Sequence, residues 1–303
     1  MSLHKKYTRT SGHNDLTKGV VNRFWKKPLY RLPGNILSLN SELFEATPTP
    51  TATPTLTPTP TTPNPLILKY DFSNTYSYPG TGVSVIDLTG HCSGSLHNGV
   101  SFGNGECGNN YIYFDGTNDY LTTDVDLNSF LQSPSSNLIS LFMWIYPIEN
   151  GVVVSEQGST TPDSDWYDAQ IELVSGVFNF GVWPYNFGTP KIISSISTPL
   201  NQWHYIGFTY DGTTLKAYVN GQLAGSSVYS RVSPGSSGKQ LHYILGYGSQ
   251  TNMSSSANFA KMQIGTLEVY NIGLSNSDVL NNYNNSSDFW NCYNTHTPTP
   301  TLT

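Results

Sequence analysis

The chain has 303 residues, of which 14 are Lys or Arg and 20 are Asp or Glu. Charged residues make up 11% of the chain, against roughly 25% in an ordinary soluble protein, whereas aromatic residues reach 13%. This composition argues against a disordered chain and a helical bundle. The apolar runs are also far shorter than the roughly 20 residues of a membrane-spanning helix, so no membrane span is predicted.

Residues 1–46 form a basic, partly apolar segment with eight Lys or Arg and three Asp or Glu. Pro28 and Pro33 divide it into pieces too short to bury a core, so we expect an arm that docks on a protein partner. No apolar stretch of a standard secretory signal is visible at its start. The rest of the chain is acidic, which argues against nucleic acid as a partner because phosphate contacts need Lys and Arg.

Residues 47–65 read TPTPTATPTLTPTPTTPNP, with seven Pro and nine Thr. Such a tract favours polyproline II and acts as a semi-rigid spacer. A Thr/Pro-rich tail returns at residues 291–303. We therefore expect one globular domain, residues 66–290, between two linker-like segments.

The sequence of residues 66–290 predicts strands and turns. A near-continuous apolar run at residues 138–146 (LISLFMWIY) suits a central strand, and Asn220-Gly221 between apolar stretches predicts a tight hairpin. Ser275 and Asp278 predict the start of one short helix over residues 274–283. The fold class is therefore an all-β, two-sheet antiparallel sandwich with an extended N-terminal arm and Thr/Pro linkers. Further strands are expected at residues 111–121, 152–155, 169–174, 177–182, 204–210, 215–219, 222–225, 243–246 and 263–270.

Several motifs of this region resemble those of the concanavalin A-like lectin/glucanase superfamily, and specifically its laminin G-like jelly-roll domains. They are residues 113–121 (YFDGTNDYL), the strand around Trp144, the stretch from Trp203 to Gly221, and the closing strand at residues 264–275. The resemblance implies a jelly roll, but it leaves the ligand open.

The glucanases of this superfamily carry an E-x-D-x-E motif, because glycoside hydrolysis needs paired carboxylates on one face. Here the nearest pair at strand spacing is Asp168 with Glu172, without a third carboxylate. His204 follows Trp203 and has no nucleophile motif nearby, so it is expected to be a hydrogen-bonded structural residue. We predict no enzymatic activity; a glycosidase would need carboxylates from different strands to meet.

Many relatives also hold Ca²⁺, but Gly265 and Thr266 replace the Asp-Glu pair of their closing strand. The loop with Asp163, Asp165 and Asp168 could bind Ca²⁺ weakly, since that ion prefers carboxylate oxygens. The alternative is a solvated loop with turn aspartates.

Loops at the rim of the predicted sandwich are rich in aromatic residues, which suit sugar rings. We expect a glycan platform here; the alternative is that these rings pack over the rim. The candidate ligand-binding residues are Trp166, Tyr167, Trp183, Tyr185, Asn186 and Tyr247.

The sequence thus favours a non-catalytic module that recognises a glycan or cell-surface polysaccharide, displayed on a Thr/Pro stalk. A lectin-like head without a visible signal fits an extracellular or virion (phage) surface appendage. The alternative is a structural, protein-binding sandwich. Cys92 and Cys107 could form a disulfide, or remain free thiols.

Overall fold

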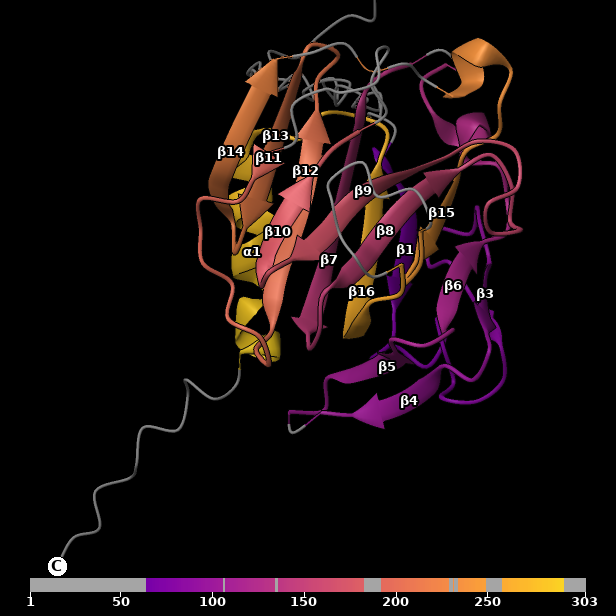
Figure 1. Ribbon diagram of the computed structural model, residues 1–303, viewed down its shortest axis with the longest axis vertical. Helices are drawn as coiled ribbons and strands as arrows, with labels where there is room; N and C mark the ends of the chain where they lie inside the picture. The colour runs from indigo at the N-terminus through magenta and orange to yellow at the C-terminus, as the bar shows by residue number, and fades with distance from the viewer. Residues whose placement is uncertain are drawn as a thin grey trace, which may run out of the picture. The chain divides into compact units, whose positions relative to one another are not determined.

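The computed structural model describes residues 64–105, 107–133, 136–182, 192–228, 231, 234–248 and 258–291. The predicted arm, most of the 47–65 linker and the tail beyond Asn291 lie outside them. The described residues form two antiparallel sheets and one α-helix (Figure 1), which confirms the predicted all-β sandwich. No helix in this described part is both long and apolar enough to cross a membrane.

The first sheet contains the longest strands and positions the helix. Its strands, in order across the sheet, are β14 (Gln222–Val228), β13 (Thr214–Val219), β12 (His204–Tyr210), β7 (Ile139–Pro147), β16 (Lys261–Tyr270), β5 (Asn110–Asp115) and β4 (Ser101–Asn104). The opening strand β1 (Leu66–Asp71) also pairs with β16, with Lys69 opposite Glu268 and Asp71 opposite Thr266. The first and last strands of the domain therefore lie side by side.

The second sheet packs against the first. Its order is β11 (Ile192–Ile193), β10 (Val177–Phe180), β9 (Tyr167–Val174), β8 (Gly151–Gln157), β15 (His242–Leu245), β6 (Tyr120–Thr123), β3 (Gly94–His97) and β2 (Ser84–Val85). Short 3₁₀ helices at Leu127–Phe130 and Pro234–Ser237 complete the described elements.

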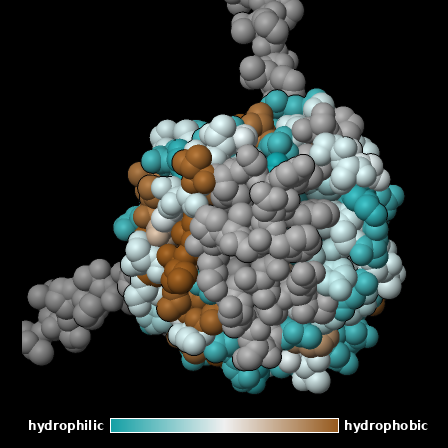
Figure 2. Space-filling view, turned by 45° about the horizontal axis from the view of Figure 1, so that its top comes forward, coloured by the Kyte–Doolittle hydropathy of each residue, from teal (hydrophilic) through white to brown (hydrophobic). Residues whose placement is uncertain are grey.

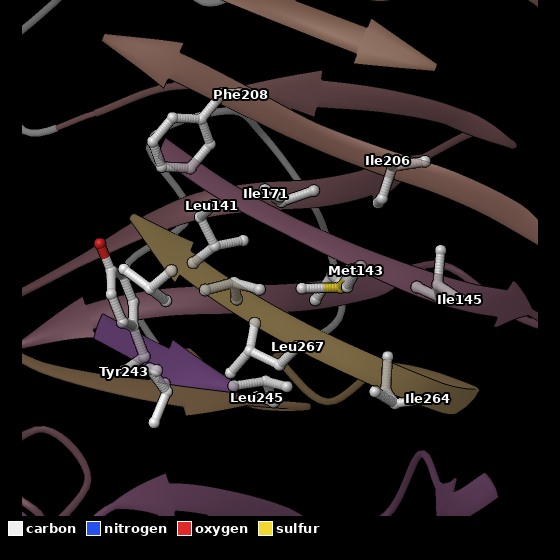
Figure 3. Packing of buried hydrophobic residues seen from close by; sticks show 14 of the residues in the cluster. Leu141, Met143, Ile145, Ile171, Ile206, Phe208, Tyr243, Leu245, Ile264 and Leu267 are labelled. Carbon is white, nitrogen blue, oxygen red and sulfur yellow. The ribbon is translucent and has the colours of Figure 1, made fainter. Parts of the chain in front are cut away.

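The packing of β7 explains why its sequence is almost continuously apolar. Leu141, Met143 and Ile145 face the core between the sheets, where they pack with side chains such as those in Figure 3. Phe142 and Trp144 point to the opposite face and join a second aromatic cluster beneath the helix. Because both faces of β7 are covered, its residues are almost all apolar, and the hydroxyl of the buried Ser140 donates a hydrogen bond to the Ile272 carbonyl at 2.7 Å.

The predicted hairpin at Asn220-Gly221 is confirmed. Both residues have positive φ (50° and 75°), as a tight turn between antiparallel strands requires, and they join β13 to β14. The side-chain oxygen of Asn220 also accepts a hydrogen bond from the backbone N–H of Tyr205 at 2.9 Å. The turn is therefore fixed to the neighbouring strand.

The helix α1 (Asn276–Trp290) begins as predicted but is longer than predicted. Ser275 is its N-cap, and with Asp278 it forms the expected capping box. The sequence after Tyr283 is rich in Asn and Ser, which are weak helix formers. Packing extends the helix, because Val279 and Trp290 are buried against the first sheet.

Cys92 and Cys107 are in different states in the structure. Cys92 is a free, buried thiol, and Cys107 is disulfide-bonded. Of the two alternatives, the Cys92–Cys107 pair is therefore wrong, and the free, buried thiol is confirmed for Cys92 but not for Cys107. Burial raises the pKa of the Cys92 thiol to about 11, so Cys92 behaves as a small apolar side chain.

The surface reflects the low charge of the sequence. In Figure 2 a band of apolar residues lies among hydrophilic and intermediate ones. Exposed apolar side chains include Ile193 on β11 and Leu223 and Val228 on β14, which are edge strands of the two sheets. Uncharged polar residues supply much of the remaining surface.

Candidate functional site

The rim residues expected to form a glycan platform are only partly visible. Trp183, Tyr185 and Asn186 lie outside the described residues. Trp166 is 8% exposed, and its indole packs so closely on Gly158 that a Cβ there would lie 2.4 Å from the ring. Tyr167 is half-buried at the start of β9. The described rim residues therefore do not present Trp166 as an open face for a sugar.

Tyr247 belongs to a row of half-buried aromatic rings on the second sheet. Its ring centroid lies 4.5 Å from that of Phe259 and 6.3 Å from that of Tyr120, and Tyr120 stacks on His97 at 4.4 Å. The Tyr247 hydroxyl donates a hydrogen bond to Asp163. Only His97 and Tyr120 are stacked face to face among these described pairs, and Tyr247 packs at a tilt against Phe259 and Tyr120.

The three aspartates considered for Ca²⁺ have different partners. Asp163 accepts from Tyr247, Asp165 forms an ion pair with Lys239, and Asp168 accepts from the Gln170 amide at 3.2 Å. Within the described residues, no group of three or more His, Cys, Asp or Glu side chains is arranged to hold a metal ion. The six to eight oxygen ligands of Ca²⁺ do not converge here.

A pocket that the sequence did not predict lies between α1 and the outer face of the first sheet. Its volume is about 410 Å³, and we call it the α1 pocket. Its residues come from β1, β7, β12, β16 and α1. The aromatic members are Trp144, Tyr205, Tyr270, Phe289 and Trp290, and the polar members are Lys69, Asp71, Thr266, Glu268, Asn282, Asn285 and Ser286, with Leu66 beside them.

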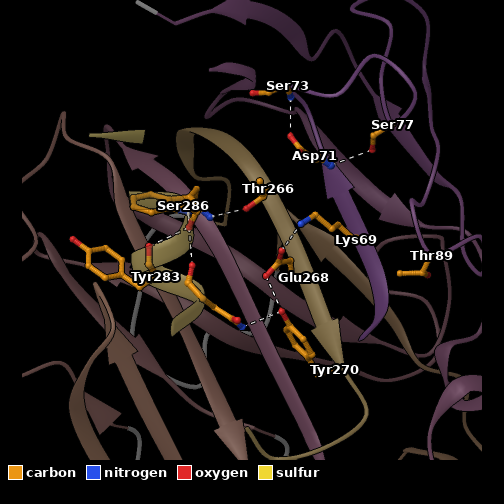
Figure 4. Close-up of polar contacts among 12 residues, drawn as sticks. Lys69, Asp71, Ser73, Ser77, Thr89, Thr266, Glu268, Tyr270, Tyr283 and Ser286 are labelled. Carbon is orange, nitrogen blue, oxygen red and sulfur yellow. Dashed lines mark hydrogen bonds and ion pairs between the residues drawn. The ribbon is translucent and has the colours of Figure 1, made fainter. Parts of the chain in front are cut away.

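Glu268 is the centre of the polar network in this pocket (Figure 4). Its Oε1 forms an ion pair with Lys69 Nζ at 2.8 Å, and its Oε2 accepts from the Tyr270 hydroxyl at 2.9 Å. The amide of Asn282 donates to that hydroxyl at 3.1 Å, which links α1 to β16. The carboxylate is thus held by Lys69 of β1 and by Tyr270 of its own strand, and α1 supports it indirectly through the Tyr270 hydroxyl.

Asp71 supplies a second carboxylate from the neighbouring strand. Its Oδ1 accepts the backbone N–H of Ser73 at 3.0 Å, and its own N–H donates to Ser77 Oγ at 3.1 Å (Figure 4). Burial raises the pKa of this carboxyl, and the negative charge of Glu268 adds to the effect, while Lys69 and the Ser73 N–H oppose it. Carboxylates from the first and last strands of the domain therefore line one pocket.

Tyr205 places a polar atom at the buried side of the pocket. The residue is 2% exposed, and burial raises the pKa of its hydroxyl well above the usual range. Glu268 and Asn282 lie near enough to affect that pKa, but the hydroxyl makes no well-formed hydrogen bond to the described residues. A buried hydroxyl in this state favours a ligand that brings a hydrogen-bonding group.

The aromatic wall is rigid because Trp290 sits over a glycine. A Cβ on Gly265 would lie 2.0 Å from the Trp290 ring, so only glycine permits this contact. Trp290 also packs on Trp203 and Trp144, with centroid distances of 4.6 and 5.9 Å. The Trp144 indole donates to Ser286 Oγ at 3.0 Å, which fastens α1 to β7. Gly265, noted above only as a departure from the calcium motif, thus has a packing role.

Sequence reasoning missed this pocket because its parts are far apart in the chain. Lys69 and Glu268 are 199 residues apart and meet only through pairing of the first and last strands. A weak signal was present, since Lys69 and Asp71 interrupt an otherwise apolar opening strand.

The family model of the concanavalin A-like lectin/glucanases superfamily matches residues 115–280, more than half of the chain. The chain belongs to this superfamily. The expected jelly roll is thereby confirmed, and the superfamily's name covers both lectins and glucanases. No curated protein matches the chain.

Solved structures similar to this chain include two with saccharide-related ligands. Domain 4 of AbnA, an extracellular arabinanase from Geobacillus stearothermophilus in complex with arabinotriose, is 19% identical with a TM-score of 0.50; the match covers 71% of this chain and 97% of that domain. A Trypanosoma rangeli sialidase in complex with 2,3-difluorosialic acid is 13% identical with a TM-score of 0.50, over 74% of this chain and 33% of the sialidase.

A third similar structure is the binding domain of Paraclostridial Mosquitocidal Protein 1. It is 17% identical with a TM-score of 0.53, and the match covers 74% of this chain and 54% of that domain. The chain thus spans about half of the toxin's binding domain and a third of the sialidase. At these identities the likeness shows a shared fold.

Proposed function

We propose that this domain is a non-catalytic carbohydrate-recognition module that binds a saccharide in the α1 pocket. The observation that carries the proposal is the joint lining of aromatic rings and convergent hydrogen-bonding groups around one cavity of about 410 Å³. This volume lies within the range of roughly 300–1,000 Å³ typical of small-ligand sites. It suits one or two sugar residues.

The chemistry of the lining matches that of a sugar. The C–H faces of a sugar ring pack on aromatic side chains, and its hydroxyls need both donors and acceptors. Phe289, 42% exposed, offers the accessible ring, while Asn285 and Lys69 donate and Asp71 accepts. The arabinotriose complex of the arabinanase domain supports the proposal, because a related sandwich holds a short saccharide.

We propose binding rather than hydrolysis, although two carboxylates meet here as a glycosidase would require. Both oxygens of Glu268 already have partners, Lys69 and Tyr270. A carboxylate engaged in this way orients a ligand better than it attacks one.

We further propose that the module is displayed on the Thr/Pro segments, at an extracellular or virion surface, and that the basic arm docks on a protein. The support for this part is the composition of residues 1–65 and 291–303.

The test is retention on a panel of immobilised neutral, amino and acidic oligosaccharides. The wild-type chain is expected to retain at least one member, and Phe289→Ala and Asn285→Ala to weaken that binding about tenfold or more. Leu280→Ala is the matched control, since Leu280 is an exposed apolar residue of α1 (44%) outside the pocket. If no saccharide is retained, or if Leu280→Ala weakens binding as much as Phe289→Ala, the proposal fails. A failure on the whole panel would favour a protein-binding sandwich.

A further inference from the structure

The charges around the α1 pocket are unequal. Among the described residues that line it, Lys69 is the one positively charged side chain, and it is already paired with Glu268 at 2.8 Å. Asp71 remains as a second carboxylate whose charge no separate cation of the lining matches. The pocket therefore carries an excess of negative charge.

This excess lies where a ligand would meet it. Glu268 is 13% exposed at its side chain and Lys69 32%, so both are shielded enough for their charges to act over a short distance with less screening than at an open surface. Asp71 is half-buried next to them, two positions along β1 from Lys69. Its Oδ1 is held by the Ser73 N–H, so the carboxylate is oriented before any ligand arrives.

An acidic saccharide would bring its carboxylate against Asp71 and Glu268 without a free Lys or Arg to receive it. Such like-charge contact, partly removed from water, is strongly unfavourable. A saccharide with a protonated amino group would instead supply the cation that Asp71 lacks. The ring of Phe289 on the same wall adds a surface that attracts cations.

Building on the proposed function, we propose that the α1 pocket selects saccharides bearing a free, protonated amino group and rejects acidic saccharides. The selectivity comes from the Asp71 carboxylate, with Glu268 and Lys69 as a preformed pair beside it.

The experiment compares three soluble tetrasaccharides by isothermal titration with the full-length protein. The pH is chosen so that the amino groups are protonated while the Asp71 carboxylate, whose pKa burial raises, is still ionised. The probes are a glucosamine tetramer, its fully N-acetylated counterpart, and a galacturonic acid tetramer. The amino tetramer is expected to bind about tenfold more tightly than the N-acetylated one, and the acidic tetramer most weakly of the three.

The variant Asp71→Asn removes the charge but keeps an oxygen that can accept the Ser73 N–H, so the fold should persist; near-ultraviolet circular dichroism and the melting temperature check this. It is expected to abolish the preference for the amino tetramer while retaining binding of the N-acetylated one. Asp288→Asn is the control, because this exposed α1 carboxylate lies outside the pocket and changes the net charge equally.

Equal or tighter binding of the acidic tetramer overturns the inference, as does an amino preference that survives in Asp71→Asn. In either case binding of the N-acetylated tetramer would leave the glycan function itself standing. Failure of every tetrasaccharide and of the whole oligosaccharide panel would overturn both.

Discussion

Because the Trp290 ring packs directly on Gly265, we predict that Gly265→Ala destabilises the domain and disturbs the α1 pocket. The added Cβ would lie 2.0, 2.4 and 2.5 Å from three atoms of the Trp290 ring, where contacts below 3.0 Å force something to move. The ring cannot shift freely, since Trp203 and Trp144 pack on it. Overpacking of this kind costs about 1–3 kcal/mol.

Urea denaturation and thermal melting measure this cost, and about 2 kcal/mol would lower the melting temperature by roughly 4–8 °C in a domain of this size. A double-mutant cycle identifies the cause. Trp290→Ala alone is expected to cost about 3–5 kcal/mol, as large aromatic truncations do, and Gly265→Ala in that background to cost little more. A change within about 0.5 kcal/mol for Gly265→Ala, or the same cost with and without Trp290, would refute the packing argument.

Three other predictions concern buried groups away from the pocket. Arg231→Met should destabilise the domain by about 3–5 kcal/mol in urea denaturation, because it leaves the fully buried Glu156 carboxylate without its ion-pair partner. Adding Glu156→Leu should recover most of this loss, and no recovery would contradict the prediction. Cys92 should resist iodoacetamide until the protein unfolds, since burial raises the pKa of its thiol to about 11, and peptide mapping that finds Cys92 labelled in the native protein would count against its burial. Burial lowers the pKa of His204, so the unfolded state binds the proton more readily and the free energy of unfolding should fall as pH drops below about 6.5; the fall should be smaller in His204→Gln, and an unchanged pH dependence would argue against the assignment.

The fold was accessible from the sequence because its signals are local. Asn220-Gly221 marks a hairpin by its own backbone preference, and Ser275 with Asp278 marks a helix start. A strand that is covered on both faces contains mostly apolar or small side chains. The apolar run at residues 138–146 therefore indicated a central strand.

The site was not accessible because it depends on strand order. Asp71 and Glu268 become neighbours only when β1 pairs with β16, and no periodicity in either strand indicates that pairing. The ion pair of Glu156 with Arg231 could not be predicted either, because these residues are 75 positions apart in the sequence. Aromatic density drew attention to Trp166, but a Trp in a loop packs into a rim as readily as it faces a ligand.

The end of α1 shows why element boundaries are hard to predict. Asn and Ser after Tyr283 disfavour a helix locally, so the prediction stopped at residue 283. The contact of Trp290 with Gly265, made across the fold, extends the helix to its last residue. Tertiary packing here outweighs local propensity.

A ¹⁵N–¹H NMR titration with whichever oligosaccharide the panel retains would locate the bound sugar on the domain. If the sugar binds in the α1 pocket, the NMR signals of the Asn282 and Asn285 side-chain amides and of the Trp144 indole N–H should shift together and saturate, because all three residues line the pocket. Shifts confined to the Trp166 indole and the surroundings of Tyr247, with the pocket resonances unchanged, would place the sugar at the rim and contradict the account.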